Sequence, residues 1–394
     1  MRMKKFKSPL SIYVLWHPEF KEGKEYAESI YNTYSGENGN ITHSKYDIPV
    51  HYRTKPYNKE TFVKIPFSES VKNALIVLVD EHMFNDSNWT IAIDKLLKSK
   101  PANTRVFPIA FSDYAFDLNP EYLSVTQFIK TTQKNPCSGN DFESNNKIIK
   151  YRLLESIAKL LFNVKDNYDT AEHSDPPIKL FISHAKDDGE DLAIKFRNHI
   201  YSNTKLKAFF DANDIAYGHQ FEQEITKHID HSAFVIFNTD IYSDREWCRK
   251  EIIIAKRYRC PIIGVIDIKK GERRSFPYSG NFPTITWNNN FEEIINLILS
   301  QVISDKYNEL YLKSIVKMYD LEKQYSCLVL PKAPELFNYI DIENLKEENK
   351  EVKSLIVLYP DPPIGIEELS LLNDVDKKIK FITPLLLPTY IPEL

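Results

Sequence analysis

The sequence predicts an α/β protein built from flavodoxin-like, doubly wound parallel sheets, followed by a small C-terminal α/β appendage. Short apolar runs alternate with amphipathic stretches along residues 178–307, which is typical of a parallel sheet with helices on both faces. The same order recurs in weaker form within the first 163 residues. Beyond about residue 319 the pattern changes to three strand-like runs that end in Pro-rich turns. These observations predict two related domains and one smaller module.

The middle segment is expected to contain five strands with helices between them. The apolar run "IKLFISHA" predicts the first strand, and Leu192, Phe196 and Ile200 recur at helical spacing in the stretch that follows it. Ile225 and Ile229 mark one face of the second helix. The expected strands are 178–185, 206–211, 233–237, 261–268 and 283–289, and the expected helices are 187–202, 222–229, 246–259 and 291–307.

The N-terminal segment is predicted to be a divergent internal copy of the middle segment. Aligning "NALIVLVDEHMFNDSNWTIAI" with "SAFVIFNTDIYSDREWCRKE" pairs Ala74 with Ala233 and Trp89 with Trp247, with one residue of slippage. Its expected strands are 11–16, 49–54, 74–79 and 105–111, and its expected helices are 23–34, 88–98 and 145–162.

The domain boundaries follow from changes in composition. We expect a first domain at 1–163, a polar linker at 164–177 that ends in two prolines, a second domain at 178–318 and a C-terminal module at 319–394. The module is expected to hold three strands and little helix, and to dock on another part of the chain because it has few apolar positions.

Composition excludes several classes of protein. The net charge of −4 arises from 51 basic and 55 acidic side chains mixed along 394 residues, so nucleic acid and anionic membranes are not expected partners. The longest apolar runs are strand-sized, and the basic start lacks a small-residue cleavage site, so neither a membrane span nor a signal peptide is expected.

The four cysteines and ten glycines exclude the common cofactor motifs. No CxxC pair, Walker loop or G-x-G-x-x-G is present, and no His lies at metal spacing. The sequence therefore predicts a cytoplasmic protein with no resident metal or nucleotide cofactor.

The candidate site lies in "YSDREWCRKE", directly after the apolar run "AFVIF". In open parallel sheets, ligands bind at the carboxyl ends of the strands, next to helix N-termini. Trp247 and Glu251 are four residues apart on the helix expected there, so they should lie on one face. An aromatic plane beside a carboxylate suits a flat cationic ring attached to a sugar.

Three motifs together resemble the bacterial type of Toll/interleukin-1 receptor (TIR) domain over residues 178–305. "LFISHAKDD" is similar to the first strand and acidic loop of that family, "FFDANDIAYGHQFEQEI" to its second strand and loop, and "YSDREWCRKE" to its W-C-x-x-E helix. In the enzymes of this family, the Glu of that helix cleaves the nicotinamide–ribose bond of NAD. The resemblance therefore implies that Glu251 is catalytic and that NAD is a substrate rather than a cofactor.

Other residues are assigned to NAD binding by the same resemblance. They are Trp247, Phe221, Gly218, His184, Lys186 and Ser243. The loop departs from the family pattern, since Tyr217 stands where a Pro is common and Phe221 comes one residue late.

Each assignment has a structural alternative. Trp247 could cap the sheet edge as a packing residue, and Phe221 could be an ordinary core residue. Glu251 could be a solvated helix carboxylate, and His184 and Lys186 could lie on a loop surface. Cys248 is expected in the core because no neighbouring base would activate it.

The predicted function is that of an NAD+ glycohydrolase or ADP-ribosyl cyclase, acting as a bacterial antiphage immune effector or signal synthase. Homo-oligomers through TIR domains and an effector or trigger protein are the expected partners. The alternative is a non-catalytic TIR scaffold that assembles through homotypic contacts. A third possibility is a flavodoxin-like response regulator that is phosphorylated on Asp211. It is disfavoured because the sequence does not match the phosphoacceptor position of such proteins or its Lys partner. In the N-terminal copy the residue four after Trp89 is Ile93, with Asp94 next, so that copy is expected to be inactive.

Overall fold

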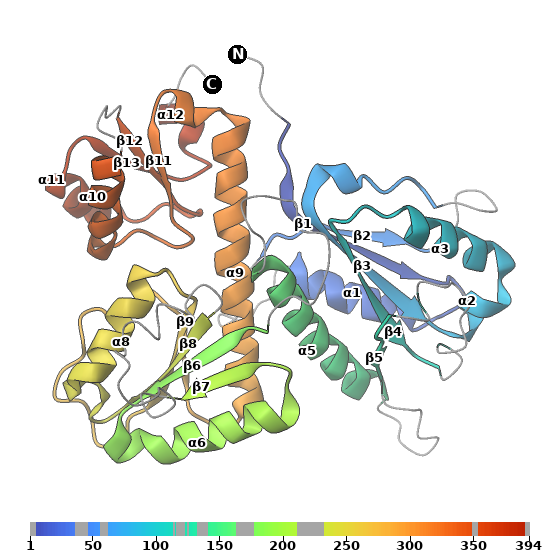
Figure 1. Cartoon of the computed structure of the whole chain (residues 1–394), viewed down its shortest axis with the longest axis horizontal. Coiled ribbons are helices and arrows are strands. Elements are labelled where there is room, and N and C mark those ends of the chain that lie inside the picture. The colour runs from blue at the N-terminus through green and yellow to red at the C-terminus, as the bar shows by residue number, and fades with distance from the viewer. Residues whose placement is uncertain are drawn as a thin grey trace. The chain divides into compact units, whose positions relative to one another are not determined.

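A computed structural model of the chain describes residues 5–35, 46–55, 62–112, 115, 123, 126–131, 141–162, 177–210, 232–348 and 354–390. The chain divides into two compact units (Figure 1). The N-terminal unit is Lys7–His173, and the C-terminal unit is Ser174–Leu394 with the first six residues of the chain.

The C-terminal unit contains the predicted flavodoxin-like sheet, here called the central sheet. Among its described residues, five parallel strands lie in the order β7-β6-β8-β9-β10, which is 2-1-3-4-5 in chain order. That order is the flavodoxin-like one, so the predicted fold class is confirmed. The strands are β6 (Lys179–His184), β7 (Lys207–Phe210), β8 (Ser232–Thr239), β9 (Ile262–Asp267) and β10 (Thr284–Thr286), and the helices are α6 (Lys186–Asn203), α8 (Glu246–Arg257) and α9 (Phe291–Met318).

Helices cover both faces of the central sheet because its strands are apolar on both sides. Phe234 of β8 and Ile252 of α8 belong to one buried cluster. On the opposite face, the ring of Phe196 from α6 lies 5.5 Å from Phe237 of β8 and 5.5 Å from Phe291 of α9. Side chains of a strand alternate between faces, so α8 covers one face while α6 and α9 cover the other. The predicted helix 222–229 and Asp211 lie outside the described residues.

The N-terminal unit has the same strand order. In its described part, five parallel strands lie in the order β2-β1-β3-β4-β5. Trp89 and Ile93 of α3 are buried in the cluster that includes Leu75 and Val77 of β3. The elements are β1 (Ser8–Trp16), α1 (Gly23–Tyr34), β2 (Val50–Arg53), β3 (Ser70–Val79), α2 (Glu81–Asn85), α3 (Ser87–Ser99), β4 (Thr104–Ala110), β5 (Ile129–Lys130) and α5 (Asp141–Phe162).

The long helix α9 connects the central sheet to the C-terminal module. The sequence predicts that this helix ends near residue 307, but it continues to Met318. Leu312 and Ile315 in the added turns are buried in one cluster with Leu358 of β12 (Leu355–Leu358) and Ile382 of β13 (Ile379–Ile382). The extension is helical because its apolar residues have the module to pack against.

The C-terminal module holds more helix than the sequence predicts. Its three parallel strands lie in the order β11-β12-β13 within the described residues, and helices follow each of them. Ile356 and Leu358 of β12 pack toward α9, whereas Leu355 and Val357 pack with α10 and α11. The charged residues from 343 to 348 belong to α10. This helix packs on the module through Ile342, which is buried. The elements are β11 (Ser326–Val329), α10 (Tyr339–Glu348), β12 (Leu355–Leu358), α11 (Ile366–Val375), β13 (Ile379–Ile382) and α12 (Leu387–Tyr390).

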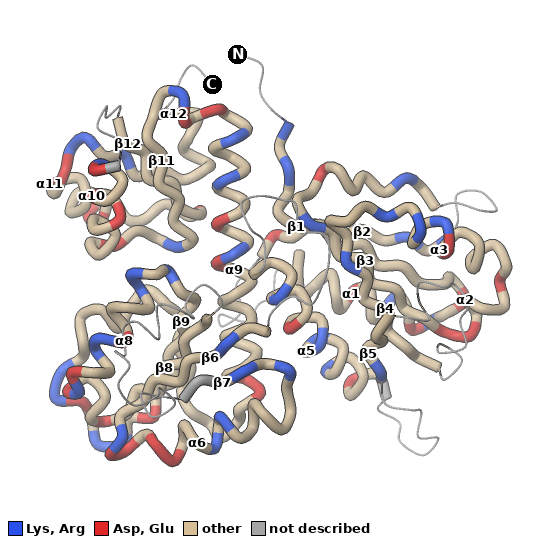
Figure 2. The backbone as a smooth tube through the Cα atoms, viewed as in Figure 1, with Lys and Arg blue, Asp and Glu red and all other residues tan. Residues whose placement is uncertain are grey.

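Charge is mixed on both units. Acidic and basic residues are interspersed along α6, α8 and α9 (Figure 2), in keeping with the small net charge. Among the described residues, no helix is long and apolar enough to cross a membrane.

Candidate functional site

The candidate site lies where the central pair of strands ends. β6 and β8 are adjacent, with Ser183 beside Ile236 and His184 beside Phe237. The strand order reverses between these two strands, since β7 lies on one side of β6 and β9 on the far side of β8. The carboxyl ends at such a reversal form the usual ligand crevice of open α/β sheets, and α6 and α8 both begin there.

Glu251 is buried, with only 4% of its surface exposed. It lies in the second turn of α8, and Ser183 at the end of β6 donates a hydrogen bond to its Oε2. The alternative that Glu251 is a solvated helix carboxylate is therefore wrong. A buried carboxylate needs such a partner, because an unpaired one would be expensive to desolvate.

A second hydroxyl supports Ser183. The Tyr242 hydroxyl lies 2.6 Å from Ser183 Oγ, and its ring is completely buried. Burial, together with the charge of Glu251, raises the pKa of Tyr242 well above its usual value, so the phenol keeps its proton. Because Ser183 gives its single proton to Glu251, Tyr242 must be the donor to Ser183. The result is a directed chain of hydrogen bonds that ends on the carboxylate.

Trp247 is largely exposed, unlike the residues of this chain of hydrogen bonds. Its ring is 60% exposed, and Lys250 Nζ lies 4.9 Å from the ring centre. Positions four apart on a helix differ by about 40° around its axis. Glu251 can therefore be buried while Trp247, on the same side of α8, remains exposed at the border of the buried surface. The alternative that Trp247 is a packing residue that caps the sheet edge is therefore wrong.

The other predicted residues are divided between core and surface. His184 is 5% exposed, with Nδ1 3.5 Å from the carbonyl oxygen of Ile182, so it is not on a loop surface. Lys186 is exposed at the start of α6. Ser243 is buried, and its hydroxyl donates to Glu272 Oε1 at 2.9 Å. Gly218 and Phe221 lie outside the described residues.

Cys248 behaves as the sequence predicts. Its thiol is 3% exposed, belongs to the buried cluster under α8, and donates to the carbonyl oxygen of His184 at 3.4 Å. The thiol thus helps to hold α8 against the end of β6.

Sequence reasoning missed the residues that brace the crevice. Asp188 accepts hydrogen bonds from the Thr239 hydroxyl at 2.7 Å and from the backbone N–H of Ile241 at 3.3 Å, and Arg245 pairs with Asp187. The first turn of α6 is thereby joined to the end of β8 and to the segment that leads into α8. Ser183 and Tyr242 were also missed, although a Ser and a His inside the apolar run "LFISHA" were an available signal.

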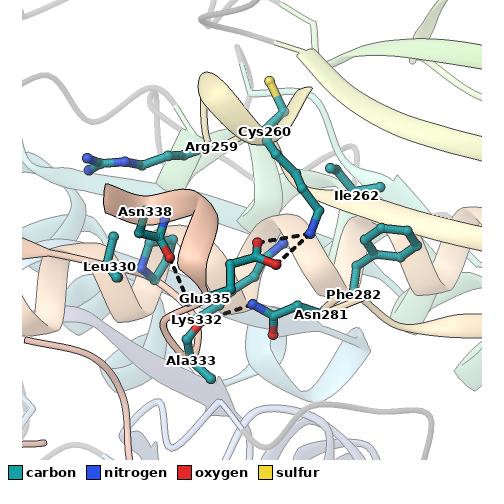
Figure 3. Close-up of a pocket in the computed structure, with 12 residues that line it drawn as sticks. Arg259, Cys260, Ile262, Asn281, Phe282, Leu330, Lys332, Ala333, Glu335 and Asn338 are labelled. Carbon is teal, nitrogen blue, oxygen red and sulfur yellow. Dashed lines mark hydrogen bonds and ion pairs between the residues drawn. The ribbon is translucent and has the colours of Figure 1, made fainter. Parts of the chain in front are cut away.

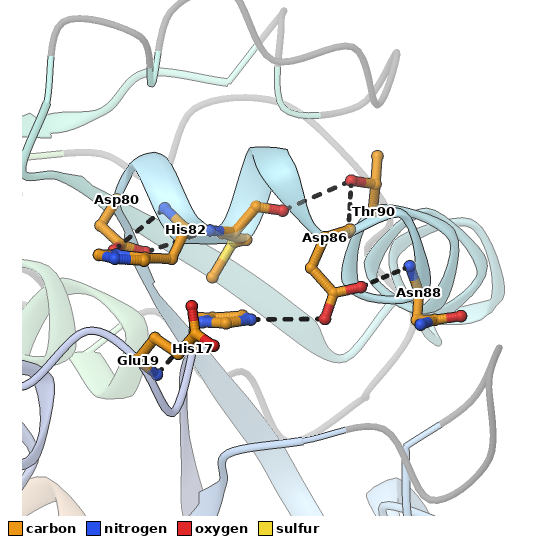
Figure 4. A network of polar contacts seen from close by, with 8 residues as sticks. His17, Glu19, Asp80, His82, Asp86, Asn88 and Thr90 are labelled. Carbon is orange, nitrogen blue, oxygen red and sulfur yellow. Dashed lines mark hydrogen bonds and ion pairs between the residues drawn. The ribbon is translucent and has the colours of Figure 1, made fainter.

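The corresponding place in the N-terminal unit carries a different set of side chains (Figure 4). Asp80 accepts from His82 Nδ1 at 2.5 Å and from the backbone at the start of α2, while His17 Nε2 lies 3.5 Å from Asp86 Oδ2. The hydrogen bond to Asp80 raises the pKa of His82. Across the described part of the chain, no group of three or more His, Cys, Asp or Glu side chains could hold a metal ion.

The N-terminal unit has no buried carboxylate at the position that corresponds to Glu251. Ile93, four residues after Trp89, is 1% exposed and lies in the core. Asp94 instead pairs with Lys98 at 2.9 Å, one turn along α3. Trp89 also differs from Trp247, because it is 1% exposed.

Comparison with known proteins identifies the domain that carries the crevice. The family model of the TIR domain matches residues 180–294, so this part of the chain is a TIR domain. No curated protein matches the chain. Among solved structures, the TIR domains of the activated Roq1 resistosome directly recognizing the pathogen effector XopQ are 19% identical over 23% of this chain and 57% of that chain, with a TM-score of 0.21. A protein of Salmonella typhimurium LT2 described as sugar-binding is 8% identical over 75% of this chain and 88% of its own, with a TM-score of 0.16. The match thus spans little more than half of the first of these structures.

Proposed function

We propose that the TIR domain cleaves the nicotinamide–ribose bond of NAD+ and that Glu251 is its catalytic residue. The observation that carries this proposal is the buried carboxylate of Glu251, oriented by Ser183 and Tyr242 at the reversal of strand order. The TIR match supplies the context, because TIR domains include enzymes of this kind.

Cleavage of the nicotinamide–ribose bond requires mainly a negative charge close to C1 of the ribose. When the bond between C1 of ribose and the nicotinamide nitrogen breaks, its electron pair leaves with nicotinamide, which departs as a neutral base. The ribose becomes oxocarbenium-like and is stabilised by a nearby carboxylate more in the transition state than in the bound substrate. Water or an internal nucleophile then adds to C1, which gives linear or cyclic ADP-ribose. Neither a general acid nor a metal is required.

Burial increases the effect of this charge. A carboxylate at a water-poor site interacts more strongly with a developing cation than a solvated one does. Ser183 holds the Glu251 carboxylate in one orientation, which limits its reorientation once a substrate is bound. The side chains of Trp247 and Lys186 are exposed in the first turns of α8 and α6, and the proposal assigns them contacts with the rest of the dinucleotide.

The test is a matched pair of substitutions on α8. Glu251→Gln keeps the shape of the side chain but removes its charge, and should lower nicotinamide release at least about a hundredfold. Glu246→Gln is the control, because Glu246 lies on the same helix, is exposed, and pairs with Lys250 at 2.7 Å. Release should stay within about twofold of native in the control. Native release in Glu251→Gln protein would refute the catalytic assignment.

Assembly without catalysis is a second candidate function, favoured by the exposure of Trp247. Exposed Trp side chains are enriched at the centres of protein interfaces, and Glu251 in this structure is closed off from solvent. In this case Trp247→Ala should abolish self-association measured by light scattering, and no NAD cleavage should be found in any variant.

The remaining proposals concern the whole chain. We propose that the N-terminal unit is a divergent, inactive TIR-like copy, because it repeats the strand order but has Ile93 where Glu251 is expected. Homo-oligomeric assembly in the cytoplasm and a role as an immune effector or signal synthase accompany this proposal. Asp94→Asn should then leave nicotinamide release unchanged.

A further inference from the structure

The last turn of α8 is joined to the C-terminal module by an ion pair (Figure 3). Lys256 Nζ lies 2.9 and 2.8 Å from the two carboxylate oxygens of Glu335. Lys256 is 9% exposed, and its Nζ lies 5.8 Å from the centre of the Phe282 ring. A lysine this well buried depends on its partner for the loss of solvation.

Glu335 is pre-oriented for this contact. It caps the short helix η7 (Leu336–Asn338), with its side chain accepting from the backbone of Asn338 and its own N–H donating to Asn338 Oδ1 at 2.9 Å. Such a capping box restricts rotation of the Glu side chain. The carboxylate is therefore presented to Lys256 with little loss of side-chain entropy on pairing.

Arg259, two residues after the end of α8, also contacts the module. Arg259 has a φ of 54°, a left-handed conformation that usually falls to Gly after a helix. Its guanidinium donates to the carbonyl oxygen of Val329 at 3.2 Å and pairs with Asp341 at 3.3 Å. A glycine would relieve the backbone but could make neither contact.

A small cavity adjoins the ion pair. Its volume is about 50 Å³, and its lining includes Lys256, Arg259, Lys332 and Glu335 (Figure 3). That space is enough to hold water. If the pair separates, water in this cavity can solvate the Lys256 ammonium and the Glu335 carboxylate. The ion pair can therefore open without leaving either charge desolvated.

The same helix carries Glu251. Lys256 follows it by five residues, which is about 7.5 Å along the helix axis. The Glu251 carboxylate is buried against Ser183, and a shift of α8 would bring it out to meet a ribose. An ion pair at the end of α8 opposes that shift.

We propose that the C-terminal module restrains the TIR domain through the Lys256–Glu335 ion pair, here called the latch. The latch holds α8 in the position in which Glu251 is buried. The restraint of activity rests on the proposed NAD cleavage. Opening the latch releases the end of α8 and lets Glu251 reach the substrate.

The test uses the full chain and two readouts. Glu335→Gln should raise nicotinamide release at least about fivefold and accelerate amide hydrogen exchange in residues 246–257 about tenfold. Lys256→Met breaks the same pair from the other side, keeps the apolar stem, and should act in the same direction. Glu251→Gln added to either variant should abolish the gain.

The matched control is Asp376→Asn. Asp376 pairs with Lys346 at 2.8 Å inside the module and is about as exposed as Glu335, with side-chain exposures of 24% and 29%. It should change neither readout. Equal gains in the Asp376→Asn and Glu335→Gln proteins, or native release and native exchange in Glu335→Gln, would overturn the proposal.

The exchange readout separates this proposal from the proposed function. If no protein releases nicotinamide, the NAD proposal fails and the restraint of activity fails with it. Faster exchange in α8 for Glu335→Gln, but not for Asp376→Asn, would still support the latch itself, and native exchange would refute it.

Discussion

Replacing Asp305 with Asn should remove a pH-dependent loss of stability from α9. Asp305 is 2% exposed, accepts a hydrogen bond from Gln301 at 2.7 Å, and lies 3.2 Å from Lys332 of the C-terminal module. Burial raises the pKa of Asp305 from 3.8 to about 6, although Lys332 acts in the opposite direction. The folded chain therefore holds this proton more tightly than the unfolded chain does.

The sign and size of the effect follow from this difference in pKa. Between the unfolded and folded values the folded state binds more protons, so stability falls as pH rises through the folded pKa, and the loss is nearly complete by about pH 7. A rise from 3.8 to about 6 amounts to about 3 kcal/mol in total, of which about 2 kcal/mol falls between pH 4.5 and pH 7.5. Asn cannot titrate, so Asp305→Asn should gain about 2 kcal/mol relative to native over that interval.

Native-state hydrogen exchange of α9 amides, corrected for intrinsic rates at each pH, measures this gain. Glu309→Gln is the control on the same helix: burial raises the pKa of Glu309, but Lys306 and Lys313, at 3.2 and 3.0 Å, outweigh burial and lower it. Its stabilising contribution is present above the unfolded pKa and is lost as pH falls, so this variant should show the opposite trend. A difference between native and Asp305→Asn that does not change with pH would refute the reasoning.

Three further predictions concern the crevice and the module. Ser183→Ala should lower nicotinamide release about tenfold and stability by about 1 kcal/mol, since it removes the hydrogen bond that orients Glu251; equal release in variant and native protein would contradict this. Trp247→Ala should change the free energy of unfolding by less than about 0.5 kcal/mol in urea titrations, because the ring is 60% exposed. Removing the chain after Met318 should expose Leu312 and Ile315, which are buried by the module, and light scattering should report aggregation; a monodisperse shortened protein would count against this packing.

Local patterns were enough to place most elements of the central sheet. The apolar runs predict β6, β8 and β9 to within about two residues at each end, and the spacing of Phe196 and Ile200 predicts α6. These signals are local because a strand buried on both faces must be apolar throughout, and a helix must be apolar on one face. The W-x-x-x-E spacing likewise places Glu251 near the crevice, since helices that follow parallel strands begin at the carboxyl edge.

The end of α9 and the helices of the C-terminal module were harder to predict. Their apolar residues are buried by segments that lie far away in the sequence, and a local pattern does not reveal those segments. Leu312 and Ile315 continue α9 on account of strands that lie later in the chain. Ile342 anchors α10, a segment that reads as charged and linker-like in sequence.

The sequence by itself determined the strand and helix pattern, the TIR resemblance and the position of one candidate carboxylate. Only the tertiary structure decided what surrounds that carboxylate. Ser183 is 68 residues from Glu251, and Lys256 is 79 residues from Glu335, so strand register and module packing bring each pair together. Burial likewise separates Trp247 from Glu251, because spacing along a helix defines a face but not the depth to which that face is covered.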